Sequence, residues 1–343
     1  MELRLLGRSG VRVSRYCLGA MAFGALGNRD HADCVRIIHA ALDAGINTVD
    51  TADVYSRGES EEIVGEALRG RRDAVVLATK CFWPMGDGPN QRGLSRRWIT
   101  TAVQASLRRL GTDWIDILYL HKPDPDTDLA ESLGALDDLV RQGTVRMIGT
   151  STLPAEQIVE AHWTAASRRL EAPVVEQPAY SLFARGAERD VLPTCVRYGM
   201  GAMVFSPLNG GWLTGKYRAG VPAEPGSRAT RWTTDHSVQP DSPVAPTKAA
   251  LVDALSAVAV DAGCGLAELA MAFALEHPAV SSAIIGPRTM GQLEQLLAGE
   301  ALRLDDEVLD RVDGIVAPGS DVDPADRWYR PTALVASARR RPR

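Results

Sequence analysis

The sequence predicts an α/β fold, and within that class a (β/α)8 barrel of the TIM type. Short apolar runs rich in Val and Ile alternate with longer segments of helical period along the 343 residues. Eight such strand–helix units fit into about 300 residues, which suits this barrel. Each predicted strand is apolar on both faces, as expected for parallel strands covered by helices.

The predicted elements follow one another in a regular order. The strands are YCLGA (16–20), INTVD (46–50), AVVLATK (74–80), IDILYLH (115–121), VRMIGT (145–150), PVVEQ (173–177), GAMVFS (201–206) and SSAIIG (281–286). The helices are expected at 31–44, 59–69, 96–110, 127–142, 153–169, 187–198, 247–262 with 266–277, 289–298 and 304–314. The alternative fold, a doubly wound open sheet, lacks its usual GxGxxG fingerprint here.

Two segments lie outside this repeat. RLLGRSGVRV precedes the first strand and predicts a β-hairpin turned at Ser9-Gly10, which would close the N-terminal mouth of the barrel. Residues 218–246 are Pro-rich and aperiodic, and structureless loops beyond roughly 15 residues are usually functional or disordered. Because this loop follows the seventh strand, on the catalytic face, we predict a lid. The whole chain, 1–343, is expected to be one barrel domain with a C-terminal tail at 320–343.

Composition excludes several classes of protein. The chain is 45% hydrophobic and 24% charged, with a net charge of −5, so it has no electrostatic footprint for nucleic acid. Its basic end, RRRPR, is interpreted as a solvated tail. The five cysteines have no CxxC spacing, and no apolar run reaches the roughly 20 residues of a membrane helix. We therefore expect a cytoplasmic protein with no membrane partner and no metal site. The sequence does not determine its oligomeric state.

Ionisable residues end three successive predicted strands. Asp50 ends the second, Lys80 the third and His121 the fourth, and Tyr55 follows in the loop after Asp50. Neighbouring parallel strands lie about 4.8 Å apart, so these groups can meet at the C-terminal rim of the barrel. Burying each charge unpaired would cost several kcal/mol, so the groups need one another or a ligand.

This set suits proton donation to a carbonyl oxygen, with Tyr55 as the acid. A lysine cation at about 4 Å, at an effective dielectric constant near 20, favours phenolate by roughly 4 kcal/mol, or about three pKa units. Asp50 would keep Lys80 charged, and neutral His121 would orient the carbonyl. Each residue alone has an ordinary structural explanation, but their joint placement favours catalysis. For Asp53 we predict no role beyond the loop.

The chain resembles the aldo-keto reductase superfamily over nearly its whole length. The resemblance rests on LGRSGVRVSRYCLGAMAFG, DTADVY, LATK, SLRRLGTDWIDILYLHKPDP, ALDDLVRQGTVRMIGTS, FSPLNGGWLTGKY and IIGPRTMGQLEQL, in the family's order. The bacterial, Kv-channel-β-subunit-like branches look most similar. The resemblance implies an NADPH-dependent carbonyl reductase in which Asp50, Tyr55, Lys80 and His121 form the catalytic tetrad.

The same resemblance implies a set of cofactor contacts. Ser151 and Gln177 would bind the nicotinamide amide, and Phe205 would stack on the ring. The residues matched to cofactor-binding positions are Ser151, Gln177, Phe205, Ser206, Leu208, Lys216, Gly286, Arg288 and Gln292. Two positions depart from the family's pattern: Thr152 and Leu296 stand where Asn is common.

Physical reasoning supports the phosphate end of this site. Gly286 and Arg288 lie between a strand and a helix N-terminus, where free N–H groups and the helix dipole attract an anion. Arg288 can bind a 2′-phosphate with its forked guanidinium, which favours NADPH over NADH. Lys216 is expected either to bind the pyrophosphate or to be an exposed loop lysine. Apolar side chains on rim loops would wall the substrate pocket: Met21, Phe23, Trp83 and Trp212.

Three functions remain open from the sequence. The first is a carbonyl reductase acting on a small-molecule aldehyde or ketone, either aromatic or a sugar. The second is an NADPH-sensing regulatory subunit that acts through a protein partner. The third is a barrel lyase or isomerase for a phosphorylated sugar, which uses the same anion site but lacks a confident catalytic Glu.

Overall fold

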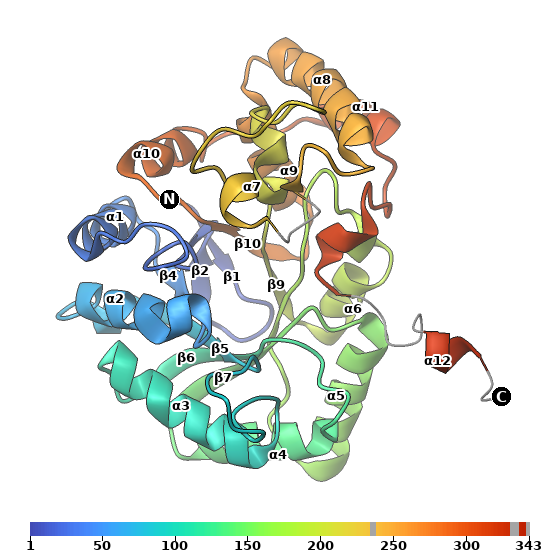
Figure 1. Cartoon of the computed structure of the whole chain (residues 1–343). Helices are drawn as coiled ribbons and strands as arrows, with labels where there is room; N and C mark the ends of the chain where they lie inside the picture. The colour runs from blue at the N-terminus through green and yellow to red at the C-terminus, as the bar shows by residue number, and fades with distance from the viewer. Residues whose placement is uncertain (234–237, 330–335, 341–343) are drawn as a thin grey trace. The chain divides into compact units, whose positions relative to one another are not determined.

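The computed structural model describes residues 1–233, 238–329 and 336–340 (Figure 1). It contains two compact units. The first comprises Met1–Pro178, Asp190–Phe205 and Ala274–Arg303, and the second comprises Ala179–Arg189, Ser206–Phe273 and the chain from Leu304. Each unit is described separately.

The first unit contains a closed barrel of parallel strands, which confirms the predicted fold class (Figure 1). In order around the barrel the neighbours are β10, β3, β4, β5, β6, β7, β8 and β9. Their bounds are β3 Tyr16–Gly19, β4 Thr48–Asp50, β5 Val76–Cys81, β6 Ile115–Leu120, β7 Val145–Ser151, β8 Val175–Gln177, β9 Gly201–Val204 and β10 Val280–Ile285. All of these pairings are parallel, so every strand presents its C-terminal end at the same rim.

The predicted N-terminal hairpin is present. Strands β1 (Leu3–Leu5) and β2 (Arg12–Ser14) pair antiparallel, and Gly10 in the turn has φ 78, a conformation that favours glycine. Ser281 at the start of β10 donates a hydrogen bond to the carbonyl of Leu5 at 2.9 Å. The hairpin therefore lies at the N-terminal mouth of the barrel, away from the rim that carries the ionisable residues.

Helices surround the barrel, because each can bury an apolar face against the strands. Most of them also begin at a residue that caps the helix N-terminus. In the first unit they are α1 His31–Asp43, α2 Glu59–Ala67, α3 Arg96–Leu110, α4 Leu129–Arg141, α5 Ala155–Arg168, α6 Val191–Tyr198 and α10 Met290–Ala298. Side chains cap several N-termini; Ser95, for example, accepts a hydrogen bond from the N–H of Trp98 at the start of α3. The barrel interior is filled by apolar side chains such as Ile117, Tyr119 and Met203.

The second unit is mainly helical. It contains the 3-10 helices η3 Gly186–Glu188, η4 Asn209–Thr214 and η6 Pro324–Arg327, with α7 Arg228–Arg231, α8 Ala245–Asp261, α11 Asp306–Ile315, α12 Ala336–Arg339 and most of α9 Leu266–Glu276. The described part of the predicted loop at 218–246 includes the short helix α7, and α8 begins at Ala245 within its last residues. Residues 234–237 lie outside the described part of the chain. Residues 330–335 and 341–343 of the predicted tail lie outside it too.

No single helix among the described residues is long and apolar enough to cross a membrane. Helices α8 and α9 meet the length and composition criteria only when taken together, and the pair is bent by 87°.

Candidate active site

The structure brings Asp50, Lys80 and His121, together with Tyr55 from the loop after Asp50, to the C-terminal rim of the barrel. Asp50 is the last residue of β4, and Lys80 lies one residue before the end of the neighbouring β5. His121 follows β6, and its N–H donates to the carbonyl of Cys81 at 3.2 Å. Tyr55 begins the 3-10 helix η1, Tyr55–Gly58, five residues after Asp50.

Lys80 is the centre of this cluster. Its side chain is buried, and the ammonium group forms an ion pair with Asp50. It also donates to the carbonyl of Thr51 at 2.8 Å and to the hydroxyl of Tyr55 at 3.3 Å. The three N–H groups of the ammonium therefore have three oxygen acceptors.

The charge on Lys80 is secured by these partners. Burial by itself would lower the pKa of Lys80, but the nearby Asp50 and Tyr55 outweigh burial and raise that pKa above its usual value. Lys80 is thus an ammonium ion across the physiological pH range. At 3.3 Å, a full negative charge on the Tyr55 oxygen would be stabilised by about 5 kcal/mol at an effective dielectric constant of 20.

Asp50 has a second partner that sequence reasoning missed. The side-chain amide of Gln177, the last residue of β8, donates to Oδ2 of Asp50 at 2.8 Å, while Oδ1 bonds to Lys80. Both carboxylate oxygens are satisfied, so the ion pair is held in one orientation. The only sequence signal was that Gln177, like Asp50, ends a strand.

His121 is neutral in this environment. Burial, followed by the positive charges of Lys80 and Lys122, lowers its pKa well below the usual value. Its Nδ1 atom is buried and has no hydrogen-bond partner among the described residues. The imidazole packs edge-on against the Tyr55 ring, with 5.9 Å between centroids, and lies 6.5 Å from the Trp83 ring. A neutral imidazole beside the phenol can donate to a carbonyl oxygen held between them.

The residues predicted to contact the nicotinamide already use some of their hydrogen-bonding groups within the protein. The hydroxyl of Ser151 donates to the carbonyl of Gln177 at 2.9 Å, and the Gln177 amide is used by Asp50. Next to them, Thr152 has φ 55, a left-handed conformation that is unusual for a β-branched residue. Its hydroxyl is buried without a partner in the described chain. Strain and an orphan hydroxyl together are typical of a ligand site.

The predicted phosphate site is open. Gly286 is exposed, and a Cβ atom there would have no neighbour within 4 Å. The backbone N–H of Arg288 donates to the side chain of Gln292 at 2.8 Å, so Gln292 caps the loop before α10. No described carboxylate lies within ion-pair distance of the Arg288 guanidinium, which leaves that cation available for an anion. Leu296 is half-buried on α10.

The remaining predicted cofactor residues belong to two units. Phe205, at the end of a segment of the first unit, is half-buried, and its N–H donates to the carbonyl of Pro178 at 3.0 Å. In the second unit, Ser206 has φ 60 and Leu208 is half-buried. Within that unit, the ammonium of Lys216 lies 5.1 Å from the Tyr217 ring.

The predicted substrate-pocket residues differ in exposure. Trp83 is 38% exposed and Met21 is half-buried, whereas Phe23 and Trp212 are fully buried. Trp212 packs against Tyr217 within the second unit, with 5.4 Å between ring centroids. Among the four, therefore, Trp83 and Met21 have side-chain surface that a ligand can reach.

A second buried acidic group lies beside the cluster. Asp53 is fully buried, and neither carboxyl oxygen has a well-formed hydrogen bond with a described residue. Burial, and then the nearby Glu61, raises the pKa of Asp53 to about 8. Glu61 itself bonds to Thr79 and to Arg109, both at 2.6 Å. The sequence offered no signal for this arrangement, because burial of a loop residue depends on contacts that local periodicity does not show.

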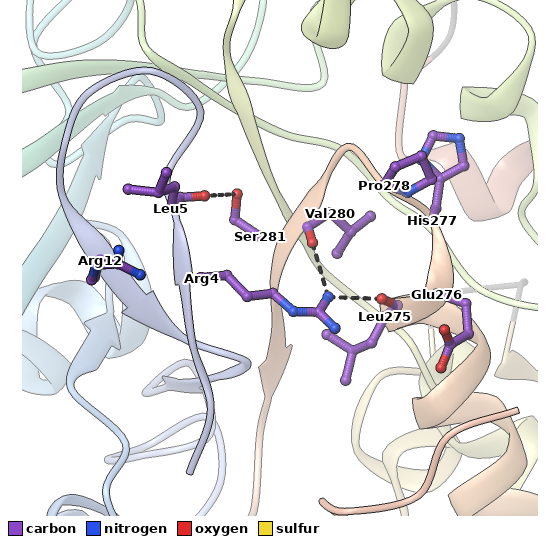
Figure 2. Close-up of a pocket in the computed structure, with 9 residues that line it drawn as sticks. All are labelled: Arg4, Leu5, Arg12, Leu275, Glu276, His277, Pro278, Val280 and Ser281. Carbon is purple, nitrogen blue, oxygen red and sulfur yellow. Dashed lines mark hydrogen bonds between the residues drawn. The ribbon is translucent and has the colours of Figure 1, made fainter.

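A cavity of about 450 Å³ lies at the opposite end of the barrel (Figure 2). It is lined by the hairpin and by the segment that enters β10. Arg4 donates there to the carbonyls of Leu275 and Val280, at 2.7 and 3.2 Å. Arg4 and Ser281 in this cavity thus join the hairpin to the barrel, and the cavity lies at the end of the barrel away from the ionisable cluster.

Comparisons with known proteins agree with this geometry. The family model described as "Aldo/keto reductase family" matches residues 15–317. A probable voltage-gated potassium channel subunit beta from Oryza sativa subsp. japonica is 38% identical over 334 residues, covering 92% of this chain and 97% of the relative. A putative subunit of the same description from Schizosaccharomyces pombe is 38% identical over 324 residues, covering 92% and 93%. An uncharacterized oxidoreductase of Bacillus subtilis (strain 168) is 37% identical over 343 residues, covering 96% and 100%.

Proposed function

The chain belongs to the aldo/keto reductase family, a family of oxidoreductases that generally bind NAD(P)H, and from this premise we propose that it reduces an aldehyde or ketone to an alcohol with NADPH. The observation that carries the proposal is the hydrogen bond from Lys80 to the hydroxyl of Tyr55. Because Tyr55 accepts this bond from Lys80, its hydroxyl can act as the donor toward a substrate oxygen.

In the proposed reaction, Tyr55 is the general acid. When bound, NADPH would provide a hydride for the carbonyl carbon. As negative charge develops on the carbonyl oxygen, the Tyr55 O–H bond breaks and the new alcohol O–H bond forms. The resulting phenolate faces the Lys80 ammonium at the hydrogen-bonding distance of 3.3 Å, and water later returns the proton. His121, neutral and edge-on to the Tyr55 ring, donates a hydrogen bond to the same carbonyl oxygen.

Asp50 and Gln177 act indirectly in this scheme. The Asp50 carboxylate keeps Lys80 charged, and the Gln177 amide fixes the carboxylate through its second oxygen. Without Asp50, burial would favour a neutral lysine, which stabilises a phenolate far less. The ion pair therefore maintains the acid strength of Tyr55.

The residues present fit a phosphorylated dinucleotide. The Arg288 guanidinium would bind the 2′-phosphate, with Gly286 leaving room for the approach. The orphan Thr152 hydroxyl and Ser151 would lie at the amide end of the nicotinamide. These features favour NADPH over NADH, because only NADPH has a 2′-phosphate for Arg288.

The proposed substrate is a small carbonyl compound that contacts Trp83 and Met21. An aromatic carbonyl and a sugar are both compatible with an exposed indole. We also propose a reducing, cytoplasmic setting, because all five cysteines are free thiols and four of them are buried.

A second function is favoured by the relatives. Two of those compared are described as subunits of voltage-gated potassium channels, so the chain could serve as an NADPH-binding regulatory subunit. The geometry of Lys80, Tyr55 and Asp50 favours an enzyme over a regulatory subunit, because cofactor binding alone requires no proton donor.

The experiment follows NADPH absorbance with a reactive aromatic aldehyde, for the wild type and for Tyr55→Phe. We expect turnover in the wild type and a loss of about 10²–10⁴-fold in the variant, which is the contribution of a general acid. NADPH binding, measured by fluorescence, should be unchanged by the substitution. Full activity in Tyr55→Phe would refute the proposed mechanism, and NADPH binding without turnover on a broad carbonyl panel would favour the regulatory subunit.

A further inference from the structure

The residues that directly follow Tyr55 form an unusual turn. Ser56, Arg57 and Gly58 all have left-handed backbone conformations, with φ of 50, 57 and 97. For Ser and Arg this region is disfavoured, so surrounding contacts must hold the turn in place. We call residues 55–60 the Tyr55 turn.

The Tyr55 turn is bonded to the loop that follows β3. This β3 loop, residues 20–29, begins at the same rim as the catalytic cluster, since the N–H of Ala20 donates to the carbonyl of Asp50 at 2.8 Å. The hydroxyl of Ser56 accepts from the N–H of Leu26 at 3.0 Å and donates to the carbonyl of Phe23 at 2.9 Å. One side chain therefore bridges both arms of the loop.

Two more side chains of the turn hold the same loop. Glu59 accepts from the N–H of Ala25 at 2.7 Å, and Ser60 donates to the carbonyl of Ala20 at 2.8 Å. The turn and the loop also pack closely, because a Cβ atom at Gly24 would lie 2.5 Å from a Glu59 carboxylate oxygen. Four backbone groups of the β3 loop are thus fixed by side chains within five residues of Tyr55.

We propose that Ser56 and Glu59 are positioning residues that determine carbonyl specificity. By fixing the β3 loop, they would hold the half-buried Met21 of that loop in one position at the rim where Tyr55 acts. The position of the loop would then limit how bulky a carbonyl substrate can reach the acid. This inference rests on the proposed reductase function, and it assigns to the turn a role distinct from proton transfer.

The chain offers matched variants for a test. Ser56→Ala removes both bonds of the hydroxyl, and Glu59→Ala removes the acceptor for Ala25. Glu59→Gln keeps an oxygen for that N–H. Arg57→Ala is the control within the turn, since the exposed Arg57 side chain has no hydrogen bond to the β3 loop in the described structure.

Steady-state kinetics should compare a bulky aromatic aldehyde with a small aliphatic one. For Ser56→Ala and Glu59→Ala we expect the KM for the bulky aldehyde to rise about tenfold, the effect of one to two lost hydrogen bonds. The KM for the small aldehyde, kcat and the Kd for NADPH should change less than about twofold, because position rather than chemistry is altered. Glu59→Gln and Arg57→Ala should resemble the wild type. An equal fall in kcat for both aldehydes would overturn the proposal.

Hydrogen exchange separates this inference from the proposed function. In the absence of any substrate, Ser56→Ala and Glu59→Ala should accelerate amide exchange in residues 20–29, whereas Arg57→Ala should not. Unchanged exchange in that segment would refute the positioning role even in an active enzyme. Accelerated exchange in a protein that reduces no carbonyl would refute the specificity role and the proposed function, but would leave the contact itself established.

Discussion

Asp53 provides the sharpest prediction about the electrostatics of this protein. It is fully buried, two residues before Tyr55, and it lacks a well-formed hydrogen bond among the described residues. Burial, followed by the proximity of Glu61, raises its pKa from 3.8 to about 8. At neutral pH the folded protein therefore holds Asp53 protonated, whereas the unfolded chain ionises it.

The replacement Asp53→Asn keeps the shape of the neutral acid and removes the titration. Between pH 4 and pH 8 the folded wild type binds one more proton at this site than the unfolded chain does, so its stability falls as pH rises. The slope is about 1.4 kcal/mol per pH unit. The Asn variant lacks this contribution, so its free energy of unfolding relative to the wild type should rise by about 2.7 kcal/mol from pH 5 to pH 7.

Urea unfolding of both proteins at pH 5, 6 and 7 measures this difference. Other groups with altered pKa values, such as the buried Glu176, contribute equally to both proteins and cancel. A difference that stays constant over this range would mean that Asp53 is ionised in the folded state. That result would refute the assignment of a neutral, buried acid beside the cluster of Asp50, Tyr55, Lys80 and His121.

Three further outcomes are expected. Arg288→Ala should raise the Kd for NADPH roughly ten- to a hundredfold and leave that for NADH unchanged, because the variant would lack the proposed charge-assisted bond to the 2′-phosphate. Lys248→Met should lower the free energy of unfolding by about 3–5 kcal/mol, since fully buried Lys248 bonds to Asn209 and Asp326, both at 2.9 Å, and its loss leaves the buried Asp326 carboxyl group without its cation. Thr152→Asn should raise that free energy by about 1 kcal/mol, because Asn tolerates φ 55 better than Thr does.

For each of these three predictions, one experimental result would contradict the reasoning. Equal weakening of NADPH and NADH binding would place Arg288 elsewhere than at the 2′-phosphate. For the buried ion pair, the double variant Lys248→Met/Asp326→Leu should regain most of the lost stability, and a further loss would show that packing rather than charge is responsible. A lower melting temperature for Thr152→Asn would mean that the Thr methyl group contributes more than the backbone strain costs.

The sequence by itself determined the barrel. Strand and helix periods are local properties, and eight apolar strands that alternate with helices leave few arrangements that bury every strand on both faces. The ionisable strand ends were also visible, because parallel strands bring equivalent ends to one rim. The proximity of Asp50 and Lys80 follows from that rule, and Tyr55 reaches the same lysine from the loop after Asp50.

Only the tertiary structure decided which side chains form hydrogen bonds with one another and which of them are buried. Gln177 reaches Asp50 across 127 positions of sequence, through the closed barrel rather than along neighbouring strands. By pattern, Asp53 is an ordinary loop residue and Trp212 is a rim aromatic that would wall the pocket, yet the structure buries both completely. The left-handed Tyr55 turn depends on bonds to a loop about 30 residues earlier in the chain. Burial and hydrogen-bond partners arise from contacts between distant segments, and periodicity along the chain contains no information about those contacts.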